Sequence, residues 1–467
     1  MAVYSSSRGK VLGFFQLVMI NVIAVDSIRT LPFSAVYGFS LVFFYLLAAL
    51  TFFIPTALVS AELGTGWPNR GGIYVWVREA FGKKVSFVVI WLNWVYNLLW
   101  YPTIMALIAG TFAYFFDSKL ADNRLYMCLS VLVLFWGATL INCLGMKASS
   151  ILSTLGALIG TIFPMLLITL LGIIWVMQDK PIQIQLDWDH FFPSGSQSSN
   201  LSFLTNVLFG LVGLEMAATH ASEMRNPARD YPRSLLVACI IIFATIVCAS
   251  LALAIVVPND QLSLATGIMQ AFAVFTQTYN LPWLLPLIAG FIVLGGLSAV
   301  GAWIIGPTKG LMVATVDGSL PAFLGRTNKQ GVPVAILLTQ AVIVSLLCLL
   351  FILLPTVNSS FWLLSVITAQ VALLVYIALF AAAVKLHYSK PDVPRHFRIP
   401  GKKFGVWTVS GFGILSCFAV FLFGFLPPAQ VPFQNLFLYE LILICGIVIC
   451  CGLPLLIIKK RSLKKRA

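Results

Sequence analysis

Long apolar runs separated by short polar segments set the pattern of the whole chain. Each run has at least 18 residues, and about 20 residues are enough for an α-helix to cross the roughly 30 Å hydrocarbon core of a bilayer. A shorter apolar stretch at 262–278 has the length of an interfacial or re-entrant helix. The long runs predict twelve spans: 11–38, 40–62, 85–113, 125–142, 150–177, 200–222, 234–257, 282–306, 333–355, 359–384, 405–426 and 434–458. We therefore expect an all-α membrane protein with 12 transmembrane helices in a single domain over 1–467.

Two of these spans are interrupted, the first by "VDSIRT" (25–30) and the sixth by "FGLVGLEM" (209–216). The two breaks are five spans apart, so a second copy of a five-span unit enters the membrane from the opposite face. Paired breaks of this kind are typical of an inverted repeat with a binding site near the bilayer midplane. We expect repeat one at about 11–177, repeat two at about 200–384, and two extra C-terminal helices within 405–458.

The composition and the charge pattern agree with this reading. The chain is 60% hydrophobic and 9% charged, with a mean hydropathy of +0.98, whereas soluble domains carry about 25% charged residues. Of the 29 Lys and Arg residues, Lys119, Arg124 and Lys180 fall outside, Arg29 falls within a span, and the other 25 flank the spans on the side of the N-terminus. The positive-inside rule predicts two cytoplasmic termini in the inner (plasma) membrane. The net charge of +14 indicates lipid contact and not nucleic-acid binding.

Metal, disulfide and enzyme chemistry have no pattern in the sequence. The nine cysteines lie almost wholly within predicted spans and show no metal-ligand spacing, so we expect no disulfide. No cofactor or metal is predicted, and the chain is not expected to be an enzyme, because the four histidines form neither an HExxH motif nor a triad. The histidines are His190, His220, His387 and His396.

Charged residues mark the first break. Asp26 and Arg29 lie near the middle of the first span, where a charged side chain costs roughly 2.5–3.5 kcal/mol. They either form a structural ion pair at i, i+3 or line a polar cavity in an unwound segment, and we favour the cavity. Pro32 is tolerated in a first helical turn, and Thr30 is a suitable N-cap. The segment "TLPFSAVYG" (30–38) thus predicts a half-helix starting at mid-membrane.

The sixth span supplies the matching half. Glu215 follows the break formed by Gly210 and Gly213; it is either a protonatable coupling site or a carboxylate that holds the break in shape. His220 and Glu223, at i, i+3, form either a gate or a helix cap. For Na⁺ coupling the candidate is Ser298 together with free carbonyls of the first span.

Two half-helix N-termini beside unwound backbone predict a zwitterionic ligand. Exposed N–H groups bind a carboxylate and free carbonyls bind an ammonium, so the natural ligand is an amino acid. In the third span, Tyr96 and Asn97 are deep enough to face the cavity, and Trp303 lies in the eighth. Core packing is the alternative role for each of these three residues.

Several motifs resemble one transporter family. These motifs are "AELGTGWPNRGGIYVWVREAFG" (61–82), "THASEMRNPARDYPRS" (219–234) and "WIIGPTKGL" (303–311). They resemble the amino acid–polyamine–organocation transporters, and among these the glutamate/γ-aminobutyrate antiporters. The resemblance implies a ten-helix inverted-repeat core with alternating access. It also implies head-group contacts from the first span and from the sixth, with Phe209 as a gating aromatic. The residues so implicated are Ala24, Asp26, Ser27, Arg29, Thr30, Phe209, Gly210, Gly213 and Glu215.

The expected function is secondary active transport of amino acids, as a permease or an antiporter. Arg29 fits an acidic substrate, unless Asp26 neutralises it, in which case neutral amino acids fit better. Proton coupling, Na⁺ coupling and exchange without an ion stay open, as does the oligomeric state. The alternatives are an amino-acid sensor and a channel, and a channel requires a ring of polar residues that the sequence does not show.

Overall fold

The fold is known from a computed structural model, which describes residues 13–68, 72–144, 156, 158–193, 200–216, 227–316, 318–428, 431 and 435–464. Every regular element in these ranges is helical. The α-helices are α1 (Phe14–Val25), α2 (Leu31–Ala35), α3 (Leu41–Ala48), α4 (Ile54–Gly66), α5 (Ile73–Phe81), α6 (Lys83–Ala113), α7 (Arg124–Cys143), α9 (Phe163–Met177), α10 (Trp188–Phe191), α11 (Leu204–Phe209), α12 (Pro227–Val256), α13 (Gly267–Thr278), α14 (Leu284–Val316), α15 (Val334–Cys348), α16 (Leu350–Leu353), α17 (Val357–Ser389), α18 (Lys402–Phe423) and α19 (Leu436–Lys464).

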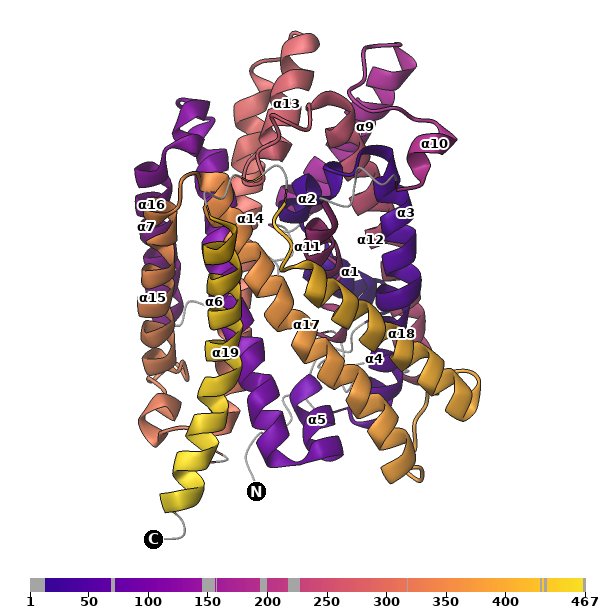
Figure 1. The fold of residues 1–467 in the computed structure, drawn as a ribbon, viewed down its shortest axis with the longest axis vertical. Helices are drawn as coiled ribbons and strands as arrows, with labels where there is room; N and C mark the ends of the chain where they lie inside the picture. The colour runs from indigo at the N-terminus through magenta and orange to yellow at the C-terminus, as the bar shows by residue number, and fades with distance from the viewer. Residues whose placement is uncertain are drawn as a thin grey trace.

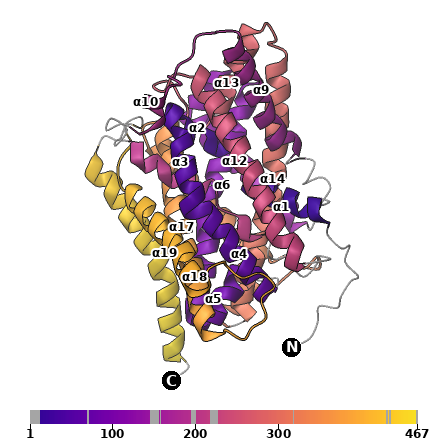
Figure 2. The ribbon, with the colours of Figure 1, turned by 90° about the vertical axis from the view of Figure 1, so that its right-hand side faces the viewer.

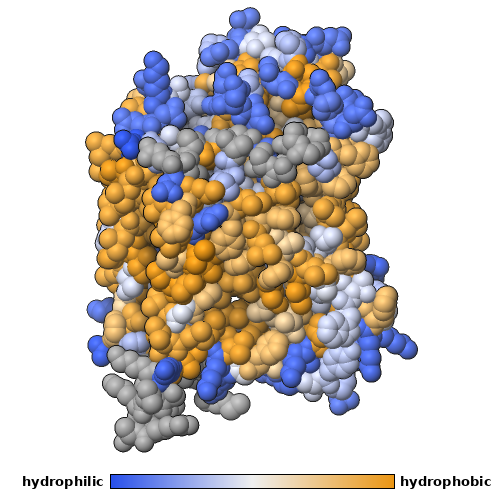
Figure 3. Space-filling model, viewed as in Figure 1, coloured by the Kyte–Doolittle hydropathy of each residue, from blue (hydrophilic) through white to orange (hydrophobic). Residues whose placement is uncertain are grey.

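Eleven helical segments in the described ranges are long and apolar enough to cross a membrane. The sixth expected span is represented by a shorter apolar helix, Asn200–Met216, which leads into residues outside the description. Figure 3 shows an apolar band around the middle of the molecule, with hydrophilic residues gathered at its two ends. The chain is therefore a multi-pass membrane protein.

The first span is broken where the sequence predicts. Helix α1 ends at Val25, and Asp26 and Ser27 have extended backbone conformations, with ψ angles of 122° and 121°. A 3₁₀ turn over Ile28–Thr30 then leads into α2, which has Pro32 in its first turn. The expected capping role of Thr30 is wrong, because its hydroxyl donates to the Ser27 carbonyl (2.9 Å) and accepts no N–H of α2.

The sixth span is broken at its two glycines. Helix α11 ends at Phe209, and the backbone turns through Gly210 to Gly213 before a single 3₁₀ turn over residues 214–216. Gly213 has a φ of +126°, a conformation that only glycine adopts without strain. The glycine break predicted from sequence is therefore present, whereas the predicted helix beyond Glu215 lies outside the described residues.

Two long helices form the centre of the molecule. Helices α6 and α17 are the most deeply buried spans and pack against each other. Helix α19 runs along the perimeter beside α6 and α17 (Figures 1 and 2), and it is the least buried span. Because α6 and α17 stand between the two broken spans and the outer helices, their side chains reach both breaks.

Two short helices lie outside the main spans. Helix α13 corresponds to the stretch 262–278 that the sequence separates from the long runs. Helix α5 was not expected; it lies inside the motif 61–82 and packs against α6 and α17. It is found beside the α17–α18 connection, at the bottom of Figure 1.

Candidate functional site

A cavity of about 100 Å³ lies between the two broken spans. One water needs roughly 10–15 Å³, so the cavity has room for several waters or one small molecule. Ten of the residues predicted as substrate contacts line it: Ala24, Asp26, Ser27, Arg29, Thr30, Tyr96, Asn97, Phe209, Gly210 and Trp303. Gly213 and Glu215 do not belong to this lining.

The two breaks touch each other at the cavity. A Cβ atom on Gly213 would lie 3.1 Å from the carbonyl oxygen of Ala24, and one on Gly210 would lie 3.2 Å from the side chain of Thr30. Contacts this close are rare for a Cβ atom and would require the neighbour to move, so glycine at both positions lets the sixth span approach the first. Residues 180 and 189 positions apart in sequence thereby form one site.

Arg29 is buried in the wall of the cavity, and among the described residues it has no carboxylate partner. Its side chain is 1% exposed, and its Nη1 donates a long hydrogen bond of 3.3 Å to the Ser365 hydroxyl of α17. Its Nε has no partner. The guanidinium also lies 5.3 Å from the ring centre of Phe209 and 6.0 Å from that of Phe33, within the range of cation–π attraction. A buried charge with so few partners is energetically costly, and an anion in the cavity would relieve that cost.

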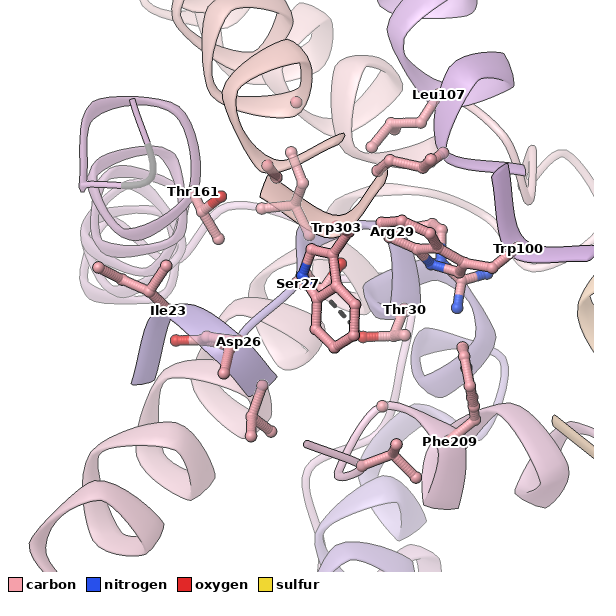
Figure 4. A pocket seen from close by; sticks show the side chains of 18 of the residues that line it. Ile23, Asp26, Ser27, Arg29, Thr30, Trp100, Leu107, Thr161, Phe209 and Trp303 are labelled. Atoms are coloured by element: carbon pink, nitrogen blue, oxygen red, sulfur yellow. Dashed lines mark hydrogen bonds between the residues drawn. The ribbon is translucent and has the colours of Figure 1, made fainter. Parts of the chain in front are cut away.

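Asp26 is oriented away from Arg29. Its Oδ2 accepts a 2.8 Å hydrogen bond from Thr245 of α12, its Oδ1 has no partner, and the residue is 5% exposed. In Figure 4 the Asp26 and Arg29 side chains lie on opposite sides of Trp303. Of the two readings left open by the sequence, the described residues therefore fit the cavity and not an Asp26–Arg29 ion pair.

Aromatic side chains close the cavity on the side of α6 and α14. Trp100 and Trp303 have ring centres 6.0 Å apart, and Tyr96 meets Phe209 edge-on at 6.2 Å. The Asn97 amide donates to the Asn93 carbonyl within its own helix (2.7 Å). These rings form the apolar part of the cavity lining, and Arg29 and Asp26 form its ionisable part.

Glu215 lies behind the break and not at the cavity surface. Its Oε2 accepts a hydrogen bond from the hydroxyl of Tyr376 on α17. The same hydroxyl accepts the backbone N–H of Gly213 at 2.8 Å. Of the two roles left open for Glu215, this arrangement fits support of the break, and a role in proton coupling stays a prediction.

Ser298, the candidate for Na⁺ coupling, does not line the cavity. Ser298 donates its hydroxyl to the Leu294 carbonyl one turn earlier in α14 (2.8 Å) and is absent from the cavity lining. His220 and Glu223 lie outside the described residues. Within the described part of the chain, no group of three or more His, Cys, Asp or Glu side chains could hold a metal ion.

Several residues at the site were missed by sequence reasoning. Trp100 follows Tyr96 by four residues, so its helical position on the same face was a usable signal. Gly160 faces Phe291 and Gly295 without room for a Cβ; small residues at such helix contacts are common in membranes. Ser365, Thr245 and Tyr376 gave no signal, since single polar residues in apolar spans are ordinary. Further lining residues are Thr161, Val212, Ile292, Gly296 and Ala299.

Comparison with known proteins places this geometry in a family. A family model described as amino acid permease matches residues 12–449. The chain is 54% identical over 453 residues to an uncharacterized transporter of Legionella pneumophila, covering 97% of both chains. It is 31% identical over 452 residues to a glutamate/γ-aminobutyrate antiporter of Lactococcus lactis, covering 95% of this chain and 89% of the relative.

A more distant relative is named for amines. The chain is 27% identical over 371 residues to a probable agmatine/putrescine antiporter of Lactococcus lactis, with 79% of this chain and 78% of the relative covered. A match across nearly all of the spans indicates common ancestry of the whole membrane domain. The chain thus belongs to the amino acid permease family, a transporter family of the amino acid–polyamine–organocation superfamily.

Proposed function

We propose that this protein exchanges amino acids across the membrane by alternating access, and that its cargo carries a carboxylate bound by Arg29. The observation that carries the proposal is the buried guanidinium in the cavity wall, which has one long hydrogen bond and no acidic partner. Arg binds a carboxylate through two parallel hydrogen bonds, and the Arg29 side chain has hydrogen-bonding capacity left over.

The rest of the cavity suits an amino-acid head group. Unwound backbone at Asp26 and Ser27 exposes polar main-chain groups beside the cavity. Asp26 places a carboxyl group on the side away from Arg29 (Figure 4). An acidic amino acid, with its side-chain carboxylate at Arg29 and its ammonium toward Asp26, matches this distribution. The glutamate/γ-aminobutyrate antiporter among the relatives supports the same substrate class.

The proposal includes the architecture expected from the sequence. We infer twelve spans in a single transporter domain, a five-plus-five inverted repeat with breaks in spans 1 and 6, and two added C-terminal helices. Support comes from the breaks at residues 26–27 and 210–213. We propose that the protein lies in the inner membrane. We also propose that both of its termini face the cytoplasm, because Lys and Arg gather on that side.

Counterflow in proteoliposomes tests the proposal. Vesicles loaded with each of the twenty amino acids or a simple amine are diluted into labelled substrate, with and without pH and Na⁺ gradients. We expect saturable exchange that is strongest for an acidic amino acid. Leakage that does not saturate would indicate a channel, and binding without exchange would indicate a sensor; either result contradicts the proposal.

Arg29→Gln provides the matched variant. Glutamine keeps a polar side chain of intermediate length but removes the positive charge. Exchange of acidic substrates should fall at least tenfold, whereas a substrate without the extra carboxylate should be affected less. Equal loss for all substrates would remove Arg29 from the recognition of the carboxylate.

A further inference from the structure

A buried ion pair joins two segments that are far apart in the sequence. Arg395 donates from Nη1 to the Glu62 carboxylate, and their side chains are 3% and 5% exposed. Arg395 also donates from Nη2 to the carbonyls of Leu386 (2.8 Å) and Lys390 (3.0 Å), and its guanidinium lies 5.2 Å from the ring centre of Trp67. The cavity does not use any of these groups.

Residues 390–399 follow α17, and we name them the strap; their second half, from Arg395 to Ile399, is hydrogen-bonded to α4. The Ile399 N–H donates to the second carboxylate oxygen of Glu62 at 2.8 Å, and the Phe397 N–H donates to the Thr65 hydroxyl at 3.2 Å. Glu62 and Thr65 come from the sequence motif 61–82, for which the transport site offers no role.

The two helices that the strap joins support different residues of the cavity from behind, and neither contributes a residue to its lining. Helix α17 contributes Ser365 to Arg29 and Tyr376 to the second break. Helix α4 packs against α12, and Thr245 of α12 binds Asp26. We call α17, which supports Arg29, one wall and the α4–α12 pair, which supports Asp26, the other wall. The strap therefore ties these two walls together at the end of the molecule where α5 and the α17–α18 connection lie (Figure 1).

We propose that the Glu62–Arg395 pair and the strap form the gate that closes the cavity toward the Lys- and Arg-rich side of the membrane. This inference rests on the proposed transport function. Alternating access requires the two walls to separate at each end of the site in turn. A contact between them that is buried and multiply hydrogen-bonded keeps one end shut, and it breaks as a unit when the site opens there.

A reversible crosslink tests the gate. Thr65→Cys combined with Phe397→Cys places two thiols across the contact while leaving Glu62 and Arg395 intact, and a short thiol crosslinker joins them. The control links Glu79→Cys to Lys390→Cys, at an ion pair whose side chains are 35% and 37% exposed. That second link holds the strap to α5, which packs on α17 itself, so it does not join the two walls.

We expect the 65–397 link to lower exchange at least tenfold, with recovery on reduction, and the 79–390 link to change it less than twofold. Substrate-induced thermal stabilisation should persist in both linked proteins, since the site stays intact. If the 65–397 link leaves exchange unchanged, the gate is refuted and the transport function stands. If neither the reduced variants nor the unmodified protein exchanges any amino acid, the transport function falls, and the gate falls with it.

Glu62→Gln gives a second test that does not depend on crosslinking. Weakening a closed gate shifts the population toward the state open on the Lys- and Arg-rich side. The KM measured from that side should fall at least threefold and the KM from the opposite side should rise, in oriented vesicles. Glu79→Gln, the matched change at the half-exposed pair, should alter neither value. A symmetric change for Glu62→Gln would contradict the gate.

Discussion

Two buried arginines have opposite surroundings in this protein. Arg395 has a carboxylate, two backbone carbonyls and a Trp ring around it. Arg29, which is equally buried, has one serine hydroxyl at 3.3 Å and two Phe rings. The first arrangement is that of a contact within the protein, whereas the second fits the carboxylate binding that we propose for Arg29.

The difference shows which of the two buried charges is compensated within the protein. A buried pair is strongly destabilised when one partner is removed, because the other charge stays buried alone. Removing a buried charge that already lacks a partner lowers the stability of the protein little. A ligand of opposite charge that binds beside such a group stabilises the folded state. The two arginines should therefore respond in opposite ways to the same substitution.

The largest expected effect is on stability. Arg395→Met leaves the Glu62 carboxylate buried with only the Ile399 N–H as a partner, and we expect a loss of about 3–5 kcal/mol in the free energy of unfolding. Arg29→Met should leave stability unchanged or raise it. Thermal unfolding of both variants in detergent, without substrate, measures the contrast. Equal destabilisation by the two substitutions would remove the distinction between the arginines.

A smaller effect is expected on substrate affinity. Arg29→Lys keeps the positive charge but loses the planar pair of donors. If charged hydrogen bonds contribute about 1.5–3 kcal/mol, the KM for acidic substrates in counterflow should rise roughly 10-fold to 100-fold. Arg395→Lys is the comparison and should lower stability without a selective effect on acidic cargo. If Arg29→Lys leaves the KM unchanged, the substrate does not form paired hydrogen bonds with the guanidinium group.

Tyr376→Phe sharpens the comparison at the second break. The substitution keeps the ring, which packs 5.3 Å from Phe52, but removes the hydroxyl that serves both Gly213 and Glu215. Leaving these buried groups unsatisfied should reduce stability by roughly 1–3 kcal/mol. Chemical denaturation measures this loss. In the Glu215→Gln background the further loss should be smaller, and full additivity would show that the two residues act independently.

The smallest effect is expected at the exposed end of the strap. Glu79 and Lys390 form an ion pair whose side chains are about one-third exposed, and such pairs contribute about 0–1 kcal/mol. Glu79→Gln should therefore shift the unfolding temperature by much less than Arg395→Met. A loss as large as that of Arg395→Met would show that the whole strap, and not its buried pair, carries the stability.

Sequence periodicity was sufficient for eleven of the twelve expected spans and for both breaks. Asp26 and Arg29 stood out because charge in a span is rare, and Gly210 and Gly213 because two nearby glycines interrupt an apolar run. Ten of the twelve residues predicted as substrate contacts line the cavity, although they make up fewer than half of its 22 lining residues. The short helix α5 was missed because nine residues are too few for a span and the surrounding loop is polar.

The partners of those residues could not be predicted. Ser365 lies 336 positions from Arg29 in the chain, and Glu62 lies 333 positions from Arg395. Nothing in either segment specifies the other, because such contacts follow from how whole helices pack. The role of Glu215 could not be predicted for the same reason, because its two possible roles depend on which residues pack against it.

The most direct test of the account is the effect of an acidic amino acid on the thermal stability of the purified protein and of its Arg29→Met variant. A ligand that binds only the folded state raises the unfolding temperature as its concentration rises. The account predicts that the unfolding temperature of the wild-type protein rises with the concentration of the amino acid. For Arg29→Met it predicts either no rise or a rise that needs at least tenfold more amino acid. If the unfolding temperatures of the two proteins depend on amino-acid concentration in the same way, the claim that Arg29 binds the substrate carboxylate is contradicted.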